Sequence, residues 1–407
     1  MIPNGYKQTE VGVIPADWRC AKIEDIATIS MCKRIFADQT TEKGEIPFYK
    51  IGTFGKEADA YISRTLYNEY RHRFSFPQKG DVLISAAGTL GRTVIYDGKD
   101  AYFQDSNIVW LDIDKNALCN EYLNHYYRII KWASSEGSTI ARLYNGIIYA
   151  TNIALPPLKE QNRIAEALSD VDSMISSLEK LIAKKKAVKQ GAMQELLTGK
   201  KRLPGFTGEW KKYKLGDICC ISGRIGFRGY TKNDLVNKGF GAITFSPSDI
   251  FEQKLDYSNC DYISFFKYDE SPEIQVFNGD IIFCKTASIG KTALVKNLTE
   301  KATINPQFVL MNKFKCNNEF LYYIISGKEF VEQILSITGG STIPTISQEQ
   351  LKMQWICMPE LDEQNAIASI LSDMDNEIEA LEQKLAKARQ IKRGMMQQLL
   401  TGKIRLL

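Results

Sequence analysis

Arginines that stand among aromatic residues are the side chains of this sequence best suited to bind a ligand. Arg71 and Arg73 flank a histidine and lie between Tyr70 and Phe74. Arginine forks donate hydrogen bonds to base edges and to phosphates. The cluster therefore indicates nucleic-acid binding, although the same composition is equally typical of a solvated charged loop.

A second cluster of this kind lies in a glycine-rich stretch, where Arg224 and Arg228 stand beside Phe227 and Tyr230. The overall charge does not decide what these arginines bind, because residues 1–154 contain 18 Lys and Arg against 18 Asp and Glu. A globular unit without excess positive charge lacks the bulk electrostatic footprint of a nucleic-acid binder. The indication of nucleic-acid binding is therefore local.

Catalytic motifs are absent from the sequence. Ser288–Thr292 ends like a phosphate-binding P-loop, but the first glycine of that motif would have to stand at Lys285. Leu155–Leu158 contains two prolines, as an amino-methyltransferase motif does, without the preceding Asn or Asp and the following aromatic residue. No G-x-G-x-x-G fingerprint and no zinc-ligand spacing occurs. The sequence favours a binding protein over an enzyme and implies no metal or cofactor of its own.

Composition and the N-terminus are those of an ordinary globular protein. The chain has 407 residues, of which 44% are apolar and 25% are charged, so two or more domains are expected. No run approaches 18 apolar residues and the N-terminus lacks an apolar signal core, so we expect neither a membrane span nor an export signal. The nine cysteines contain no CxxC pair. We expect free thiols and a cytoplasmic protein.

The elements that must position these residues are revealed by a stretch that occurs twice, 203 residues apart. Glu160–Asn162 at its start returns as Glu363–Asn365, and the Leu-Leu-Thr-Gly-Lys that ends at Lys200 returns ending at Lys403. A repeat of this length without a gap indicates an internal duplication.

Each copy is predicted to form one long helix. The apolar steps alternate between four and three residues, which is the pattern of a heptad seam. About 40 residues at a rise of 1.5 Å per residue make a helix of roughly 60 Å. Two seams of equal length most simply pair with each other, although each could instead pack on its own globular neighbour. The seam positions are Ile164, Leu168, Val171, Ile175, Leu178 and Ile182, and then Ile367, Leu371, Met374, Ile378, Leu381 and Leu385.

The two globular units are related but not alike. Both have short runs of Val, Ile and aromatic residues separated by Gly and Asp, which are strand signals. Anchors such as Gly80-Asp81 and Gly279-Asp280, or Gly137–Ile140 and Gly340–Ile343, match between them, while the residues between the anchors differ. We expect an α+β fold with pseudo-twofold symmetry, in which two mixed α/β domains are joined by two long antiparallel coiled-coil helices. The domains are placed at residues 5–154 and 204–357, and the helices at 155–203 and 358–407.

These motifs together resemble one known family. The segment Pro156–Gln161, the helix end Met193–Lys200, and Gly340–Pro344 are similar to the corresponding parts of the DNA-specificity subunit of type I restriction–modification enzymes. The resemblance extends from Trp18 to Leu406. The chain departs from the pattern at Met358–Glu360, where the usual double proline is missing, and the first unit has Ala-Arg where the second has Pro-Thr.

The resemblance implies a non-catalytic subunit. Two target-recognition domains, residues 5–154 and 204–357, would each read one half of a bipartite, asymmetric site in double-stranded DNA. Two methyltransferase subunits, which would carry the S-adenosylmethionine, are expected to dock on the repeated helices, and restriction (motor-nuclease) subunits to join them. The candidate DNA-binding residues are Arg71, Arg73, Arg92, Arg142, Arg224, Arg228, Lys285, Lys291 and Thr345. The candidate partner-binding residues are Leu168, Val171, Leu178, Met193, Leu196, Leu371, Met374, Leu381, Met396 and Leu399.

Two other functions stay open at the level of sequence. The chain could itself be a DNA methyltransferase, against which the missing catalytic motifs argue. It could also be a coiled-coil scaffold whose units bind proteins, in which case it would not retain a specific DNA duplex at physiological salt. The target sequence cannot be read from the residues, because base readout depends on loop geometry.

Overall fold

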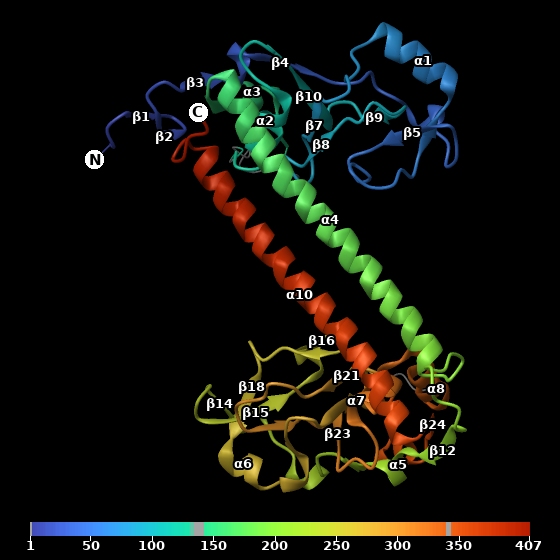
Figure 1. Ribbon diagram of the computed structural model, residues 1–407. Helices are drawn as coiled ribbons and strands as arrows, with labels where there is room; N and C mark the ends of the chain where they lie inside the picture. The colour runs from blue at the N-terminus through green and yellow to red at the C-terminus, as the bar shows by residue number, and fades with distance from the viewer. Residues whose placement is uncertain (1, 131, 133–141, 339–342) are drawn as a thin grey trace. The chain divides into compact units, whose positions relative to one another are not determined.

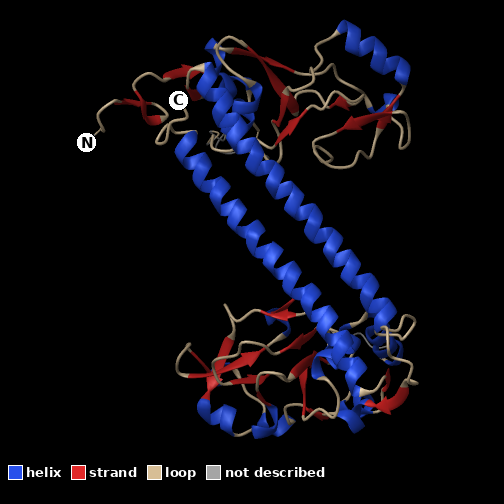
Figure 2. Ribbon diagram, viewed as in Figure 1, coloured by secondary structure: helices blue, strands red, loops and turns tan. Residues whose placement is uncertain are grey.

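The computed structural model describes residues 2–130, 132, 142–338 and 343–407. They form two compact units, Met1–Glu179 with Gln383–Leu407 (unit 1) and Lys180–Glu382 (unit 2). Figure 1 labels many of the elements of both units, and Figure 2 distinguishes their strands from their helices. The matching motif at residues 137–140 and most of its copy at 340–343 lie outside the described residues.

Unit 1 is built on two small sheets. The inner sheet has the strand order β4-β10-β7-β8 and is antiparallel, and the outer sheet has the order β6-β5-β9 with a parallel β5–β9 pair. Two further pairs, β1 with β2 and β3 with β11, complete it. The bounds are β1 Tyr6–Thr9, β2 Gly12–Pro15, β3 Arg19–Lys22, β4 Ala27–Ser30, β5 Ile46–Tyr49, β6 Tyr61–Ile62, α1 Arg64–Arg73, β7 Val82–Ser85, β8 Thr93–Ile95, β9 Tyr102–Phe103, β10 Ile108–Ile113, α2 Asn120–Tyr126, α3 Asn145–Tyr149 and β11 Asn152–Leu155.

Unit 2 repeats this plan with a larger outer sheet. Its inner sheet has the order β13-β23-β20-β21, and its outer sheet has five strands in the order β14-β18-β15-β22-β19. The pairs β12–β24 and β16–β17 are antiparallel. The bounds are β12 Lys211–Lys214, α5 Leu215–Ile218, β13 Cys220–Ser222, β14 Leu235–Val236, β15 Gly241–Phe245, β16 Ile250–Phe251, β17 Lys254–Leu255, β18 Asp261–Ser264, α6 Phe265–Asp269, β19 Gln275–Val276, β20 Ile281–Cys284, β21 Thr292–Leu294, β22 Ala302–Ile304, β23 Phe308–Asn312, α7 Asn318–Ser326, α8 Lys328–Ile337, α9 Gln348–Lys352 and β24 Trp355–Met358.

Each inner sheet is buried on both faces. Along β10, Val109 and Leu111 point into one hydrophobic core, while Ile108 and Trp110 point into the other. Along β23 the residues from Phe308 to Met311 alternate in the same way between two cores. Side chains of a strand alternate between faces, so a strand with a core on each side reads as a continuous apolar run.

The two repeated segments each form one long helix, as the seam predicts. Helix α4 spans Leu158–Leu196 and helix α10 spans Leu361–Leu399, 39 residues each. Each ends before a glycine with positive φ, +68° at Gly199 and +71° at Gly402, a conformation that glycine adopts without strain.

The halves of the helices pair antiparallel within each unit. In unit 1, Glu179 binds Arg389 with a 2.6 Å contact, and Asp172 binds Lys392. In unit 2, Lys185 contacts Glu377 at 2.6 Å, and Lys189 contacts Asp375 at 2.6 Å. Residue numbers rise along α4 as they fall along α10, which confirms the antiparallel arrangement.

The seams also pack on the globular parts, so both arrangements considered for the helices are realised. Leu168 and Leu399 lie in the unit 1 core, and Leu196 and Leu371 lie in the unit 2 core; all four are buried. Their assignment to partner binding is therefore wrong for this structure, because a side chain inside a core offers no surface to another subunit. Of the other candidates, Leu381 is buried, and the following are half-buried: Val171, Leu178, Met193, Met374 and Met396.

Among the residues that the structure describes, no helix is long and apolar enough to cross a membrane. The nine cysteines are all free thiols.

Candidate nucleic-acid interface

The repeated Glu-Gln pair attaches each globular part to its helices. In unit 1, Gln161 Nε2 donates to the carbonyl oxygens of Ala117 (2.8 Å) and Pro156 (2.9 Å), and its Oε1 accepts from the amide of Cys119. In unit 2, Gln364 makes the same kind of contacts, donating to Pro359 O and accepting from a backbone amide of the α7 N-terminus. One amide side chain thus satisfies backbone groups on two elements.

The glutamate of the pair forms a buried ion pair with the last segment of the opposite helix. Glu160, whose side chain is 3% exposed, accepts from Arg405 Nε (2.8 Å) and from Trp18 Nε1 (3.0 Å). Arg405 also donates to Asp17, and this hydrogen bond lowers the pKa of the Asp17 carboxyl. Glu363 is equally buried against Arg202 with contacts of 2.7 and 2.6 Å.

An aspartate in each helix forms the third attachment. Asp172 binds Lys392 and Arg128, and it lies 3.9 Å from Nδ1 of the buried His125. Burial lowers the pKa of His125 to about 4, so the ring is neutral near pH 7. In unit 2, Asp375 accepts from Tyr323 Oη at 2.8 Å. These attachments fix each globular part on the helix halves of its own unit.

The hairpin loop between β7 and β8 lies at one end of the unit 1 inner sheet. Its backbone is hydrogen-bonded to two neighbouring segments: Ala86 N donates to Asn107 O, and Ala86 O accepts from Leu143 N, each at 2.8 Å. Ala87 also forms a bridge with Arg142. The loop contains Gly88 with φ of +67°.

The loop between β20 and β21 repeats this construction in unit 2. Lys285 N donates to Gln307 O, and Lys285 O accepts from Ile346 N, each at 2.9 Å. Thr286 forms the bridge with Thr345. Ala287 stands where unit 1 has its glycine and has φ of +60°, a conformation in which an L side chain is strained. We call residues 85–92 with 142–143, and residues 284–291 with 345–346, the hairpin clusters of units 1 and 2.

Two of the candidate DNA-binding cations hold the clusters together. Arg92 Nη2 donates to Ile51 O at 2.9 Å, and Lys291 Nζ donates to Pro247 O at 2.7 Å. Both carbonyls stand two residues after the end of a matching outer-sheet strand, β5 or β15. Arg92 and Lys291 therefore join the hairpin to the outer sheet in this structure, and their assignment to DNA contact stays a prediction.

The glycine-rich arginines are also engaged within unit 2. Arg224 is 6% exposed, stacks on Tyr230 and donates to Ile304 O and Thr303 Oγ1. Burial lowers the pKa of its guanidinium. Arg228 is half-buried, with Nη1 3.5 Å from a carboxylate oxygen of Glu273. Arg224 cannot reach DNA in this conformation, because its donors face the protein interior.

The first arginine cluster lies on α1, against the outer sheet of unit 1. Arg71 Nη1 donates to Tyr67 Oη at 3.0 Å and lies 3.6 Å from Asp100, while Arg73 pairs with Glu69 at 2.6 Å. No contact among the described residues joins either arginine to the hairpin cluster. The structure thus separates Arg71 and Arg73 from the other candidates.

Of the candidate DNA-binding residues, Arg142 lies in the hairpin cluster of unit 1, and Lys285 and Thr345 lie in that of unit 2. Arg142 is exposed and Lys285 is half-buried, and within the described residues neither has a side-chain partner. Sequence reasoning missed Arg34, which lies near the same end of unit 1 and contacts Asp105 at 2.8 Å. The sequence does contain a signal for Arg34. It stands 16 residues after Trp18, and the position 16 residues after the matching Trp210 lies between Arg224 and Arg228, so continuing the match would have identified it.

No group of three or more His, Cys, Asp or Glu in the described parts of the chain could hold a metal ion. The donors of the hairpin clusters are instead cations and backbone amides, which suit an anionic or hydrogen-bonding ligand.

Known proteins with the same construction are specificity subunits. The MjaVIII type I restriction enzyme specificity subunit of Methanocaldococcus jannaschii is 25% identical over 431 aligned positions, covering 99% of this chain and 96% of that protein. S.HindORF215P of Haemophilus influenzae, provisionally named a type I restriction enzyme specificity subunit, is 54% identical over 157 residues, 39% of this chain and 41% of that protein.

The fold is that of a solved specificity subunit. The crystal structure of the type I restriction–modification S subunit from M. genitalium matches with a TM-score of 0.64 and 14% identity, over 98% of this chain and 97% of that one. A structure from a study of complex assembly and conformational transition of the type I system matches with a TM-score of 0.56 and 18% identity, over 96% and 99%.

The family model of the type I restriction modification DNA specificity domain matches the chain twice, at residues 15–190 and 207–390. The two matches follow the internal repeat and together span most of the sequence. Because both matches are to a specificity domain, the alternative that the chain is itself a DNA methyltransferase is set aside. The chain belongs to the family of type I restriction–modification DNA specificity subunits, the non-catalytic members of their enzyme systems.

Proposed function

We propose that the chain binds duplex DNA at a bipartite, asymmetric site, with residues 5–154 reading one half-site and residues 204–357 the other. Two methyltransferase subunits, which carry S-adenosylmethionine, dock on the chain, and restriction (motor-nuclease) subunits join for cleavage. The observation that carries this proposal is the contrast between matched frameworks and unlike outer sheets in the two units. A matched framework suits one partner bound twice, and unlike outer sheets suit two different DNA sequences.

The outer sheets differ in size and in surface chemistry. That of unit 1 has three strands and carries the ten-residue helix α1, whose first residue, Arg64, pairs with Asp100. That of unit 2 has five strands and the five-residue helix α6, whose first residue, Phe265, has Lys301 Nζ 5.3 Å from its ring centroid. Two surfaces this different would favour different bases and groove shapes.

Within each unit we place a DNA contact at the hairpin cluster. Arg142 and Lys285 present cationic donors there, close to backbone that the inner sheet and the bridges hold in place. Such donors are suited to phosphate oxygens or to base edges. Thr345 adds a hydroxyl at the same place in unit 2.

Replacing Arg142 or Lys285 by alanine should weaken or relax only one half of the recognised sequence. A lost base contact is expected to cost about 1–3 kcal/mol at one position, whereas a lost phosphate contact weakens all sequences alike. The measurement is methylome sequencing of a host that expresses each variant with the methyltransferase subunit. Titration of the purified assembly with site-containing and scrambled duplexes at physiological salt gives the affinities.

Lys115→Ala and Lys315→Ala are the matched controls. Both lysines are exposed and follow β10 and β23, at the ends of these strands opposite the hairpin clusters. They should leave both half-sites unchanged. If the controls weaken binding as much as Arg142→Ala and Lys285→Ala, the hairpin clusters are not the contact. If the wild-type assembly prefers no sequence, the chain is a protein-binding scaffold and the proposed function fails.

A further inference from the structure

The turn between strands β16 and β17 of unit 2 combines a left-handed backbone with residues that rarely adopt it. Phe251 pairs with Lys254, so Glu252 and Gln253 form a two-residue loop, which we call the β16–β17 turn. Their φ angles are +46° and +63°. A hairpin turn with two positive φ angles favours Asn-Gly, and larger side chains are strained there. Such strain persists only where the surrounding contacts hold the residues in place.

The side chain of Gln253 binds the edge strand of the inner sheet at the hairpin cluster of unit 2. Its Oε1 accepts from the amide of Thr292, the first residue of the edge strand β21, at 2.7 Å, and its Nε2 donates to Gly290 O at 3.4 Å. Thr292 is completely buried, so its amide needs a partner within the protein. Cys284 N donates to Lys291 O at 2.8 Å and closes the loop between β20 and β21. Gln253 therefore holds this loop at its base.

The rest of the turn is bound to helices. Glu252 Oε2 lies 2.6 Å from Lys186 Nζ on α4, and the same ammonium group lies 2.8 Å from Glu382 on α10. On the other side, Tyr322 Oη of α7 donates to the carbonyl oxygen of Gln253 at 2.9 Å. The turn thus connects the loop between β20 and β21 to three helices of unit 2.

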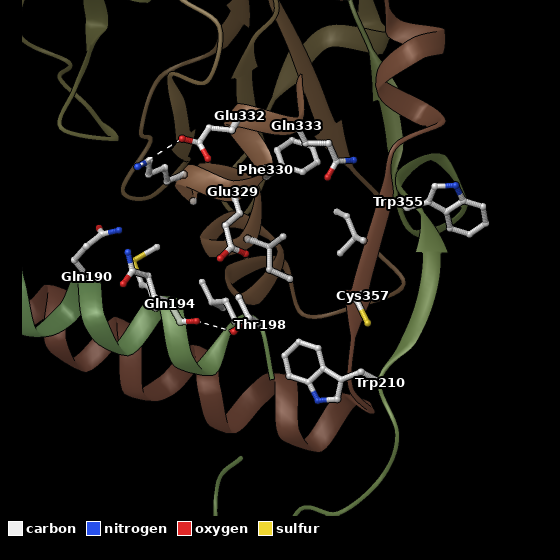
Figure 3. A pocket seen from close by; sticks show the side chains of 16 residues that line it. Gln190, Gln194, Thr198, Trp210, Glu329, Phe330, Glu332, Gln333, Trp355 and Cys357 are labelled. Carbon is white, nitrogen blue, oxygen red and sulfur yellow. Dashed lines mark hydrogen bonds and ion pairs between the residues drawn. The ribbon is translucent and has the colours of Figure 1, made fainter. Parts of the chain in front are cut away.

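Helix α8 supports a second side of the loop. A Cβ added at Gly290 would lie 2.7 Å from Val331, and Phe330 packs edge-on against Phe283 of β20, with ring centroids 6.2 Å apart. Figure 3 shows Gln194 of α4 and Phe330 of α8 on different sides of a cavity of about 510 Å³. At this level α8 and α4 face each other across the cavity, whereas the turn links the loop to α4 by direct contact.

Unit 1 holds the corresponding strand in a different way. Thr93, the first residue of β8, stands where unit 2 has Thr292, and its Oγ1 donates to Asn124 Oδ1 of α2 at 3.2 Å. Asn124 stands where the matching helix α7 has Tyr322. Helix α2 therefore binds the edge strand directly, while in unit 2 the tyrosine binds the turn. This difference between the units fits a role in one half-site only.

We propose that Gln253 is a positioning residue for DNA recognition by unit 2. It fixes the loop between β20 and β21, and with it Lys285, relative to the helices of that unit. The inference rests on the proposed function and adds how the DNA contact is held in place. A loop without this support samples several positions, and its donors then meet correct and incorrect bases alike. Discrimination between bases falls as a result, because base readout depends on hydrogen-bond geometry.

The double substitution Glu252→Asn/Gln253→Gly tests the proposal with residues that suit the turn. Asn-Gly is the preferred pair for this backbone, so the hairpin should still fold while both side-chain contacts are lost. The full chain is assembled with the methyltransferase subunit. Its affinity is measured for the site that methylome sequencing identifies for the wild type, and for duplexes altered at one base pair in either half. The ratio of affinities should fall about tenfold for changes in the half read by residues 204–357 and stay constant for the other half.

A conservative variant and a matched control accompany this test. Gln253→Glu keeps an acceptor for the Thr292 amide, so its ratios should stay within about threefold of the wild type. Asn297 is exposed, has φ of +59° and follows the other end of β21. Asn297→Gly therefore also relieves a left-handed residue, and it should leave the ratios for both halves unchanged.

Hydrogen exchange of the β20 and β23 peptides separates positioning from stability. In the Glu252→Asn/Gln253→Gly variant, the opening of these core strands should stay within about threefold of the wild type. If opening rises in step with the loss of discrimination, the turn only stabilises unit 2 and the positioning role is wrong.

The outcomes also separate this proposal from the proposed function. A folded Glu252→Asn/Gln253→Gly assembly that discriminates as well as the wild type overturns the positioning role and leaves the proposed function standing. A wild-type assembly that discriminates at neither half overturns both.

Discussion

Replacing Arg405 by methionine is expected to destabilise unit 1 by about 3 kcal/mol. Glu160 is 3% exposed and would lose both contacts from the guanidinium, keeping only its hydrogen bonds from Trp18 and a backbone amide. Removing one partner of a buried ion pair leaves an uncompensated charge, which costs more than the pair contributes. Arg202→Met should do the same to unit 2 through Glu363.

Hydrogen exchange followed by mass spectrometry measures this effect unit by unit. Arg405→Met should raise the opening of unit 1 peptides by about 100-fold and leave unit 2 peptides near wild type. Arg393→Met, at an exposed arginine of α10, the helix that precedes Arg405, is the control and should change neither. A loss of only about 0–1 kcal/mol, as for a surface ion pair, would contradict the role of Glu160 as a buried anchor.

Leu168→Ala and Leu371→Ala should each cost about 2–5 kcal/mol of stability in the isolated chain. Each leucine is completely buried, one in each core, so truncation leaves a cavity that the neighbouring side chains fill only in part. Met174 on the same helix as Leu168 is 46% exposed, and Met174→Ala should change stability by no more than about 0.5 kcal/mol.

Chemical denaturation of the three variants without any partner distinguishes a core role from a docking role. If Leu168→Ala were as mild as Met174→Ala, the seam would face solvent in the free chain. The original assignment of these leucines to a partner surface would then be restored.

The long helices could be predicted because a heptad seam is a local pattern. Spacings of three and four residues place Leu168 and Leu178 on one face of a helix whatever lies opposite. The pattern does not say which apolar surface covers each position. Leu168 packs in a domain core while Leu178 is half-buried, and only the tertiary structure decides between them.

The candidate interface was predictable in part, for a similar reason. The residue types of Arg92 and Lys291 suit DNA, but their carbonyl partners lie 41 and 44 residues away in the sequence. Proximity of this kind comes from the sheet topology, and strands of two to five residues with both faces buried lack the alternation that reveals them. Arg142 is exposed and Lys285 is half-buried, and the assignment of both to DNA binding stays a prediction.

The modular reading of DNA is tested most directly by exchanging residues 204–357 for the corresponding region of a family member with a different target. The hybrid is expressed with the methyltransferase subunit, and the host's methylated sites are sequenced. One half of the recognised sequence should change to that of the donor, while the half read by residues 5–154 stays the same. A hybrid that is folded and active but changes both halves, or neither, would contradict the assignment of one half-site to each unit.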